Sequence, residues 1–362
     1  MGRVLHGPEI YEHQVTAYLE EFFRGLGVPF QRQPIAPARD NIIARWERPG
    51  AERTLLLEAH QDTVPTDHMT IDPFGAKIED GRLYGRGACD VKGGMAAMLA
   101  AFARLVRERP SGASNVILAC TVDEEHTFLG VQQLVRGGVR ADFAVVAEPT
   151  QLQIVNAHKG VVRWQVETRG RSCHSSAPEK GSNAIYHMAR VLPAIEQFAD
   201  WLRGSRADTL LGPPTLSVGR IEGGSSANTV PDRCAIDIDR RLLPGEDPLA
   251  APNQLATFLK TKLPPELTFV RSEVRLRAPA LSAAGSENLV DRLADAIDAV
   301  RGAHQVTAVP YCTDASTLAE AGIAAVVFGP GDIAKAHTCD EWVALGEVEQ
   351  ASEILYHLVC AA

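Results

Sequence analysis

Ionisable side chains follow four short apolar runs of the sequence. They are His60 and Asp62 after the first run, Glu124 and Glu125 after the second, Glu148 after the third, and His337 a little beyond the fourth. In an open α/β sheet, ligands bind in the crevice outside the carboxyl ends of the strands, so we expect these side chains to converge. Carboxylates crowded in this way repel each other unless they are protonated or bind cations. Two histidines and three acids would give about five ligands, enough for a pair of zinc ions that keep open positions.

Each of these segments also has an ordinary structural interpretation. A lone His-x-Asp such as His60 to Asp62 is more often surface polarity, and Glu124 with Glu125 after a strand is usually a solvated turn. Asp90 could cap the helix that follows it. These ordinary interpretations would have to coincide at five places along the chain, and we therefore favour the metal site.

The apolar runs before these residues have the length and composition of strands buried in an α/β sheet. The four runs are 55–59, 116–122, 143–147 and 324–328. Helical periodicity predicts helices at 15–26, 93–107, 287–300 and 347–359, and Gly27 ends the first of them as a C-cap. We therefore expect an α/β domain whose strand ends carry the polar residues.

The middle of the chain has a different pattern. Residues 161–168 and 234–239 alternate apolar and polar side chains, which indicates half-exposed antiparallel strands. A long helical stretch, 183–202, lies between them and contains Pro193, which should kink or break it. The chain has 362 residues, more than usually fold around a single hydrophobic core. We predict a discontinuous domain of residues 1–154 and 276–362, with a second domain of residues 155–275 inserted into it.

Composition and charge argue against several functions. The formal net charge of −9 disfavours nucleic acid and anionic membrane surfaces as partners. No apolar run reaches the roughly 18 residues of a membrane span, and no signal peptide follows Met1. The seven cysteines form no C-x-x-C pair, which fits reduced thiols in a cytoplasmic protein.

A series of ordered motifs covers nearly the whole chain and resembles the acetylornithine deacetylase and succinyl-diaminopimelate desuccinylase family of two-zinc metallopeptidases. The motifs are 57–65, 85–94, 123–125, 147–150, 158–160, 174–176, 228–231, 239–245, 311–314 and 336–341. The resemblance implies an α/β catalytic domain with a mixed sheet of the zinc-peptidase type. It also implies an inserted α+β domain, an antiparallel sheet with helices, that serves as dimerisation domain and lid. Family members usually carry a further helix before the point where this chain begins. Either the start codon is assigned too late or the protein folds without that helix, a difference that we expect to affect stability more than chemistry.

Carried over residue by residue, the resemblance assigns five metal ligands. They are His60, Asp90, Glu125, Glu148 and His337, with Asp90 bridging two zinc ions that cobalt or manganese can replace. Asp62 would accept a hydrogen bond from the His60 ring and fix its tautomer. Glu124 would be the general base, which takes a proton from the attacking water and passes it to the leaving amine. The family also often has a cis peptide after the bridging aspartate, here Asp90–Val91.

The same resemblance assigns three residues of the inserted domain. His174 would reach the active site of the partner subunit in a homodimer and help to hold the oxyanion. Asn228 and Arg241 match substrate-binding positions, and the Arg241 guanidinium is suited to grip a carboxylate through two hydrogen bonds. Ordinary interpretations stay open for these two, because Asn228 could cap a turn and Arg241 could be a charge on a strand surface.

Within the family, residues 173–185, 311–314 and 328–337 most resemble acetylornithine deacetylases. We therefore expect deacetylation of N-acetyl-ornithine, a step of arginine biosynthesis, or of a near relative such as acetyl-lysine or acetyl-citrulline. The desuccinylase is the first alternative, and a dipeptidase or carboxypeptidase of the same fold is the second. A catalytically dead relative that only binds is a third, although the presence of Glu124 beside all five ligands argues against it.

Overall fold

The computed structural model describes residues 11–361, which divide into two compact units. The first unit consists of the chain up to residue 157 together with 282–308 and the segment from 313 onward, and the second of 158–281 with 309–312. The predicted boundaries lie nearby, at 155 and 275, and the assignment of each unit as a separate domain stays a prediction. None of the described helices is long and apolar enough to cross a membrane. The predicted lack of a signal peptide concerns residues 1–10, which lie outside the described part of the chain.

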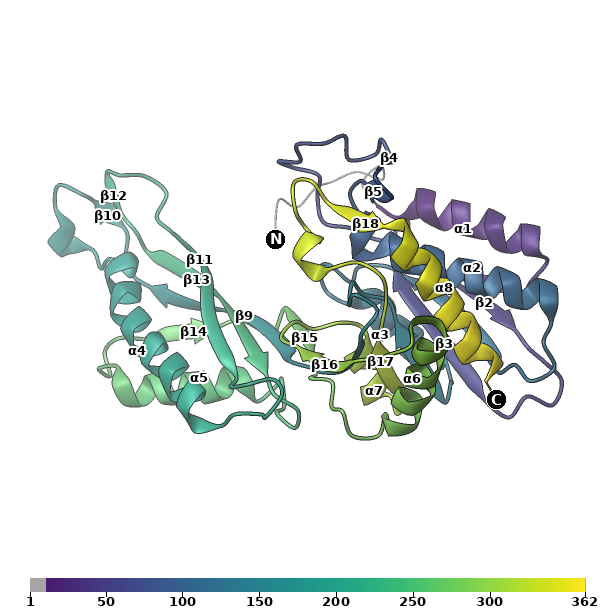
Figure 1. The fold of residues 1–362 in the computed structure, drawn as a ribbon. Helices are drawn as coiled ribbons and strands as arrows, with labels where there is room; N and C mark the ends of the chain where they lie inside the picture. Colours follow the sequence, from purple (N-terminus) through teal and green to yellow (C-terminus); the bar gives the residue numbers. More distant parts are fainter. Residues whose placement is uncertain (1–10, 362) are drawn as a thin grey trace. The chain divides into compact units, whose positions relative to one another are not determined.

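A mixed eight-stranded sheet is the centre of the first unit (Figure 1). Its strands, in spatial order, are β1 (Phe30–Ala36), β2 (Arg39–Trp46), β6 (Asn115–Thr121), β3 (Thr54–His60), β7 (Phe143–Val146), β17 (Ala324–Val327), β8 (Ile154–His158) and β16 (Val306–Val309). The strand β3 runs parallel to β6 and β7, and β7 runs parallel to β17, so these four strands end at the same edge. They coincide with the four apolar runs, and the expected α/β class with a mixed sheet is confirmed.

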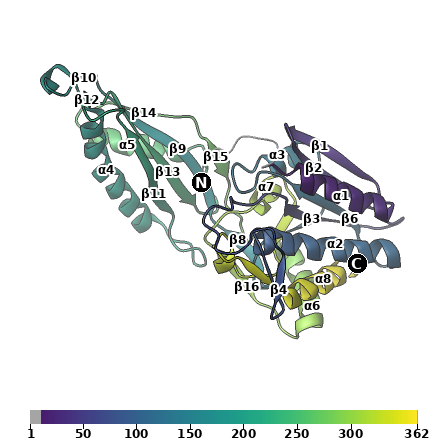
Figure 2. The same cartoon turned by 90° about the horizontal axis from the view of Figure 1, so that it is seen from above.

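Four helices pack against this sheet and share its main core. They are α1 (His13–Leu26), α2 (Gly93–Glu108), α6 (Glu287–Arg301) and α8 (Leu345–Cys360), with α2, α8 and α6 side by side in Figures 1 and 2. Leu55 and Leu57 of β3 belong to one buried core with Phe102 of α2 and Ile354 of α8. Leu56 is equally buried but points to the opposite face of the sheet, because successive side chains of a strand alternate.

Smaller elements complete the first unit. Two short helices, α3 (Leu129–Arg136) and α7 (Ala315–Glu320), contact each other and strands of the large sheet. A separate three-stranded sheet has the spatial order β18 (Trp342–Ala344), β5 (Arg82–Tyr84) and β4 (Lys77–Glu79). The pairing of β18 with β5 ties the segment after His337 to the segment before Asp90, two predicted ligands that are far apart in the sequence.

A five-stranded antiparallel sheet is the centre of the second unit. Its strands are β11 (Thr215–Gly223), β13 (Arg233–Leu242), β9 (Gly160–Arg169) and β14 (Phe269–Arg271) in spatial order, with β15 (Leu276–Ala278) also paired to β9. The helices α4 (Ala184–Ser205) and α5 (Ala251–Lys262) pack on this sheet around a separate core that contains Trp164, Phe198 and Ile236. A two-stranded ribbon pairs β10 (Cys173–His174) with β12 (Thr229–Val230). The unit is the antiparallel sheet with helices that we expected for the inserted segment.

The helix α4 is not broken at Pro193, where the sequence predicts a kink or a break. The helix α4 runs as one element of 22 residues across this position. Pro193 has no N–H for the carbonyl of Ala189, but both residues lie on the exposed side of the helix, where that carbonyl can be hydrated. Val191 and Ile195, on the buried side, keep the helix packed on the sheet through this turn. Tertiary packing therefore outweighs the local preference of proline.

Candidate metal centre

The polar residues predicted at the strand ends lie at one edge of the large sheet. His60 is the last residue of β3, Glu148 comes shortly after β7, and Glu124 and Glu125 lie in the turn that follows β6. His60 is 2% exposed and Glu148 4% exposed. The parallel strands thus deliver imidazole and carboxylate groups to one place, because their carboxyl ends meet there.

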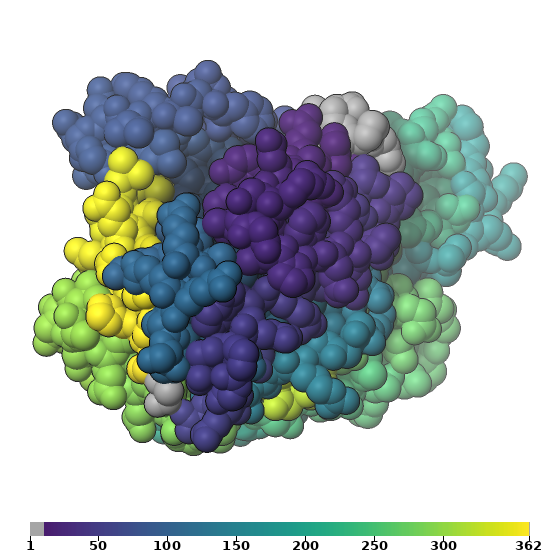
Figure 3. All heavy atoms as spheres, turned by 90° about the vertical axis from the view of Figure 1, so that its right-hand side faces the viewer, coloured from purple at the N-terminus to yellow at the C-terminus, as the bar shows by residue number. Residues whose placement is uncertain are grey.

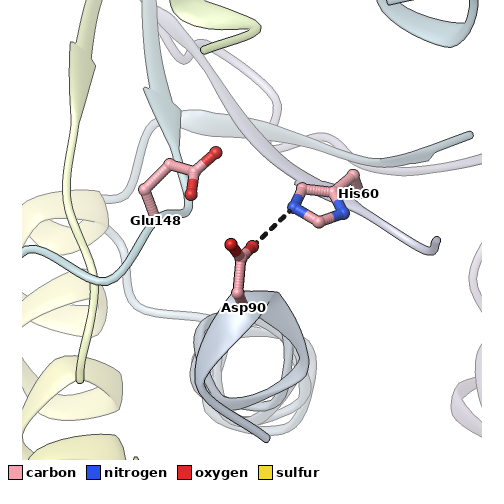
Figure 4. Close-up of side chains that lie close together, drawn as sticks. All are labelled: His60, Asp90 and Glu148. Atoms are coloured by element: carbon pink, nitrogen blue, oxygen red, sulfur yellow. Dashed lines mark hydrogen bonds and ion pairs between the residues drawn. The ribbon is translucent and has the colours of Figure 1, made fainter. Parts of the chain in front are cut away.

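Asp90 reaches this edge from a different kind of element. It lies in a short irregular helical turn, η2 (Ala88–Lys92), just before α2, and the Asp90–Val91 peptide bond is cis, as the resemblance implied. The residue at the N-cap of α2 is Lys92, so Asp90 does not have the capping role considered as its ordinary interpretation. Figure 4 shows the Asp90 carboxylate pointing from this turn toward His60.

Asp90 lies between the two histidines. Its Oδ1 atom is 3.0 Å from Nε2 of His60, and its Oδ2 atom is 3.2 Å from Nε2 of His337. The same nitrogen of His337, which follows the short turn η4 (Ile333–Lys335), is 2.9 Å from Oε1 of Glu125. Two groups of three result, each with its ligand atoms within 4.8 Å of one another. One group is His60, Asp90 and Glu148, the other is Asp90, Glu125 and His337, and Asp90 belongs to both.

The cluster concentrates negative charge in a buried place. Burial, reinforced by repulsion from Asp90, raises the pKa of Glu148 well above its usual value. Burial and the charge of Glu148 do the same to the pKa of Glu124, and burial also raises the pKa of Glu125. Hydrogen bonds to Asp90 and Glu125 raise the pKa of His337 to about 10. Burial and the repulsion among neighbouring carboxylates thus disfavour the ionised acids, and bound cations would offset this repulsion.

The two groups fit divalent cations such as zinc. Imidazole nitrogen and carboxylate oxygen are ordinary zinc ligands, and each group offers one histidine and two carboxylates. Three protein ligands leave a position open for water or substrate, as catalytic sites require. The two oxygens of Asp90 face different histidines, which is the arrangement that a ligand shared by two ions needs.

Asp62 lies next to the His60 ring and also contacts the turn after β6. The main-chain carbonyl of Asp62 lies 3.0 Å from Nδ1 of His60, whereas its carboxylate is 3.6 Å from that nitrogen. The carboxylate instead accepts hydrogen bonds from the main-chain N–H groups of Glu124 at 3.2 Å and Glu125 at 3.0 Å. Asp62 therefore connects the end of β3 to the turn after β6 as well as orienting the imidazole.

Sequence reasoning missed the role of a buried ion pair behind Asp90. Oε1 of Glu341 accepts hydrogen bonds from the main-chain N–H groups of Cys89 at 2.9 Å and Asp90 at 3.0 Å. Its Oε2 atom is 2.5 Å from Nη1 of Arg86, and Glu341 is completely buried. Both residues lie in motifs that carried the family resemblance, but nothing in the sequence shows that they meet.

A pair of buried carboxyl groups, those of Glu58 and Asp314, lies behind His60 and was also not predicted from the sequence. Glu58 is buried in β3, and Oγ1 of Thr121 donates to it at 2.5 Å and lies 3.3 Å from Oδ2 of Asp314. Burial raises the pKa of Glu58 to about 7 and that of Asp314 well above its usual value. The available signal was a glutamate inside an otherwise apolar run, where a charged residue needs a partner.

The three residues predicted in the inserted segment belong to the second unit, and their roles stay predictions. His174 lies exposed on β10, next to Asn228, whose carbonyl accepts the N–H of Ser175 at 2.9 Å. Nδ1 of His174 accepts the main-chain N–H of Ser176 at 3.2 Å, so its Nε2 atom carries the proton. Nε of Arg241 donates to Asp239 on the same strand at 2.9 Å.

Known proteins resemble the chain over most of its length. Residues 56–361 match the model of peptidase family M20/M25/M40. An acetylornithine deacetylase from Myxococcus xanthus is 34% identical over 88% of this chain and 83% of its own. Among solved structures, an M20 family metallo-carboxypeptidase from Sulfolobus solfataricus has a TM-score of 0.79 at 20% identity, covering 96% and 93% of the two chains. A dinuclear metal-binding M20 peptidase from Bacillus subtilis has a TM-score of 0.69 at 15% identity, covering 96% and 92%.

Proposed function

Because the chain is a hydrolase of peptidase family M20/M25/M40, we propose that it uses two metal ions to cleave the amide bond of an N-acyl amino acid, with N-acetyl-ornithine as substrate. The observation that carries this proposal is the position of Asp90, whose two oxygens face two separate ligand groups beside Glu124. The relative from Myxococcus xanthus, 34% identical over 325 aligned residues, is an acetylornithine deacetylase, which supports the choice of substrate.

Five side chains would hold the ions. His60, Asp90 and Glu148 would bind one, and Asp90, Glu125 and His337 the other. Zinc is the ion that we favour, with cobalt or manganese as substitutes, because the donors are imidazoles and carboxylates. When bound, such ions polarise the acyl carbonyl and lower the pKa of water.

Glu124 would be the general base. It lies close to His60, Glu148 and Glu125 without belonging to either ligand group, so its carboxylate is available to accept a proton. The carboxylate would take a proton from water as the water oxygen bonds to the acyl carbon. The same proton would pass to the nitrogen of the leaving amine as the C–N bond breaks, which yields acetate and the free amino acid.

The second unit would bind the rest of the substrate. The Nε2–H of His174 is free of the contacts that occupy Nδ1 and is suited to donate to the oxyanion. Arg241, which is only 27% exposed, would bind the α-carboxylate through guanidinium N–H groups other than the Nε that Asp239 occupies.

We further propose a homodimer formed through the second unit. Among the described strands, β11 pairs only with β13, so its other edge is available for pairing. Ile221 on this strand is 54% exposed, and Tyr186 on the neighbouring helix α4 is 67% exposed. Pairing of β11 with its copy would cover this edge and allow His174 to serve the partner subunit.

The proposed substrate would place the enzyme in arginine biosynthesis and in the cytoplasm. None of the seven cysteines forms a disulfide in the described part of the chain. Cysteines without disulfides are typical of proteins in a reducing compartment, which supports the location.

A substrate screen tests the proposed function. The protein is stripped with a chelator, reloaded with zinc or cobalt, and assayed with N-acetyl-ornithine, succinyl-diaminopimelate and dipeptides. We expect metal-dependent release of acetate, with N-acetyl-ornithine giving the highest kcat/KM. A preference for the succinyl substrate or for dipeptides would change the substrate and leave the chemistry intact. Binding without turnover in every arm would instead identify a non-catalytic relative.

The role of Arg241 has its own test. Arg241→Ala should raise KM for N-acetyl-ornithine about tenfold or more, because a charge-assisted hydrogen bond to the α-carboxylate is lost. The methyl ester of the substrate should already be poor with the wild-type protein. Equal kcat/KM on the acid and the ester would remove Arg241 from the substrate site.

A further inference from the structure

Arg39, the first residue of β2, links the start of α1 to the turn after β6. Its Nη1 atom is 2.5 Å from Oδ1 of Asp123, and its Nε atom is 2.9 and 3.1 Å from the two oxygens of Glu12. Its Nη2 atom also contacts Glu12. The Arg39 side chain is 17% exposed, and those of Glu12 and Asp123 are 3% and 2% exposed. The guanidinium therefore joins two buried carboxylates in a geometry that only its planar fork can provide.

Asp123 is the residue that shapes the turn beneath Glu124 and Glu125. Its φ is 70°, a left-handed conformation that residues with a side chain rarely adopt. Its carbonyl accepts the N–H groups of Thr127 at 3.1 Å and Phe128 at 2.8 Å. Its carboxylate is held by Arg39 and by the Thr127 hydroxyl. The side-chain contacts thus stabilise a conformation that the backbone alone disfavours.

We propose that Arg39 is a positioning residue for the hydrolytic reaction. Anchored by Glu12, it holds Asp123 and thereby fixes the turn that presents Glu124 to the reacting water and Glu125 to a metal ion. Asp62 secures the following two main-chain N–H groups from the other side of this turn. The inference rests on the proposed function for its catalytic consequence, while its effect on metal affinity can be measured without any substrate.

The chain contains a matched control for this arginine. Arg32, on the adjacent strand β1, also joins two carboxylates, those of Glu20 and Asp40. It is 37% exposed and does not touch the turn after β6. Figure 3 shows the surface that α1, β1 and β2, drawn in purple, form on this side of the first unit. Substitution of Arg32 therefore reports the loss of an arginine bridge that does not hold Asp123.

The first experiment compares Arg39→Lys with Arg32→Lys. Lysine keeps the charge but cannot engage both carboxylates at once. We expect Arg39→Lys to lower kcat about 10-fold to 100-fold with KM near that of the wild type. Affinity for one of the two zinc ions, measured by competition with a chromophoric chelator, should fall by about the same factor, the usual effect of losing a residue that supports a ligand. Arg32→Lys should change neither quantity.

A double-mutant cycle provides the second measurement. Asp123→Asn keeps a residue that tolerates left-handed backbone and removes the charge that Arg39 contacts. If both residues act through one contact, the double variant should lose no more kcat and zinc affinity than the more impaired single variant. Additive losses would overturn the proposal.

Two further outcomes separate this inference from its alternatives. If Arg39→Lys only lowers the melting temperature and leaves kcat and zinc affinity unchanged, Arg39 is a structural residue and the proposal fails. If the wild-type protein hydrolyses none of the substrates but Arg39→Lys still weakens one zinc site, the proposed function fails and the positioning role stands.

Discussion

The ligand group around His60 in the first unit and the predicted site residues His174 and Asn228 in the second differ in burial. In the first unit, His60, Asp90 and Glu148 are between 2% and 6% exposed and lie close to one another. In the second unit, His174 and Asn228 are exposed and form hydrogen bonds mainly with their immediate neighbours. Buried charges need partners or cations, so the function of the first cluster can be inferred from a single chain. The function of exposed residues can be inferred only from their contacts with substrate or with another subunit.

The largest effect should come from the residue common to both ligand groups. Asp90→Ala removes a ligand of both proposed ions at once, so we expect loss of both metals and of all measurable activity. Metal content by mass spectrometry and deacetylation assays check this. Asp340→Ala, at an exposed carboxylate three residues after His337, is the control and should keep both ions. A fully metal-loaded, active Asp90→Ala protein would contradict the proposed centre.

A smaller effect should distinguish the proposed base from the ligands. Glu124→Gln keeps the shape of the side chain but cannot accept the proton, so kcat should fall by about 10²-fold to 10⁴-fold. Metal content should stay near that of the wild type, because Glu124 belongs to neither ligand group. Loss of metal from this variant would show that the roles of Glu124 and Glu125 are exchanged or wrong.

The second unit can be tested by mixing subunits. If His174 serves the partner subunit, His174→Ala and Glu124→Gln homodimers should each be nearly inactive. A mixed dimer would have one site with an intact Glu124 and a partner's intact histidine, and one site that lacks both. Random assortment makes about half of the dimers mixed, so about a quarter of wild-type activity should return after co-expression. No recovery with mixed dimers demonstrably present would place His174 in its own subunit's site or outside catalysis.

The smallest effect concerns stability and pH in the second unit. His158 is completely buried, and burial lowers the pKa of its imidazole to about 4. The unfolded chain takes up a proton near pH 6.5 whereas the folded chain does not, so stability is full above pH 6.5 and falls as the pH drops toward 4. The lowered pKa of His158 changes the free energy of unfolding by at most about 3 kcal/mol over this pH range. Calorimetry from pH 7 to 4 should show a shallower pH dependence for His158→Gln, and an unchanged slope would contradict the assignment.

The strand-end residues were predictable because their positions follow from topology. His60, Glu125 and Glu148 each come after a buried strand, and parallel neighbours place such residues at one edge. Asp90 does not follow a strand, and only the motif around it indicated that it joins the others. Glu341 and Arg39 could not be found in this way, because each acts through a contact with a distant segment, 251 residues away in the case of Glu341 and Asp90.

Local rules were also insufficient in the second unit. Pro193 predicted a kink or a break in α4, but the helix is continuous because its buried side packs on the sheet. Arg241 donates a hydrogen bond to Asp239 on its own strand, and both of its predicted roles, substrate binding and strand-surface charge, stay open. A substrate carboxylate could compete with Asp239 for this guanidinium. No pattern in the sequence of a single chain predicts whether it does, because the outcome depends on the bound ligand.

The strand order of the large sheet has a consequence for biosynthesis. The strand β17 lies between β7 and β8, although β17 is synthesised long after both. On the ribosome, His60, Asp90 and Glu148 have all been synthesised before the second unit emerges, whereas His337 has not. The second ligand group, and the contacts of Glu341 with the turn that carries Asp90, can form only when the last part of the chain closes the sheet.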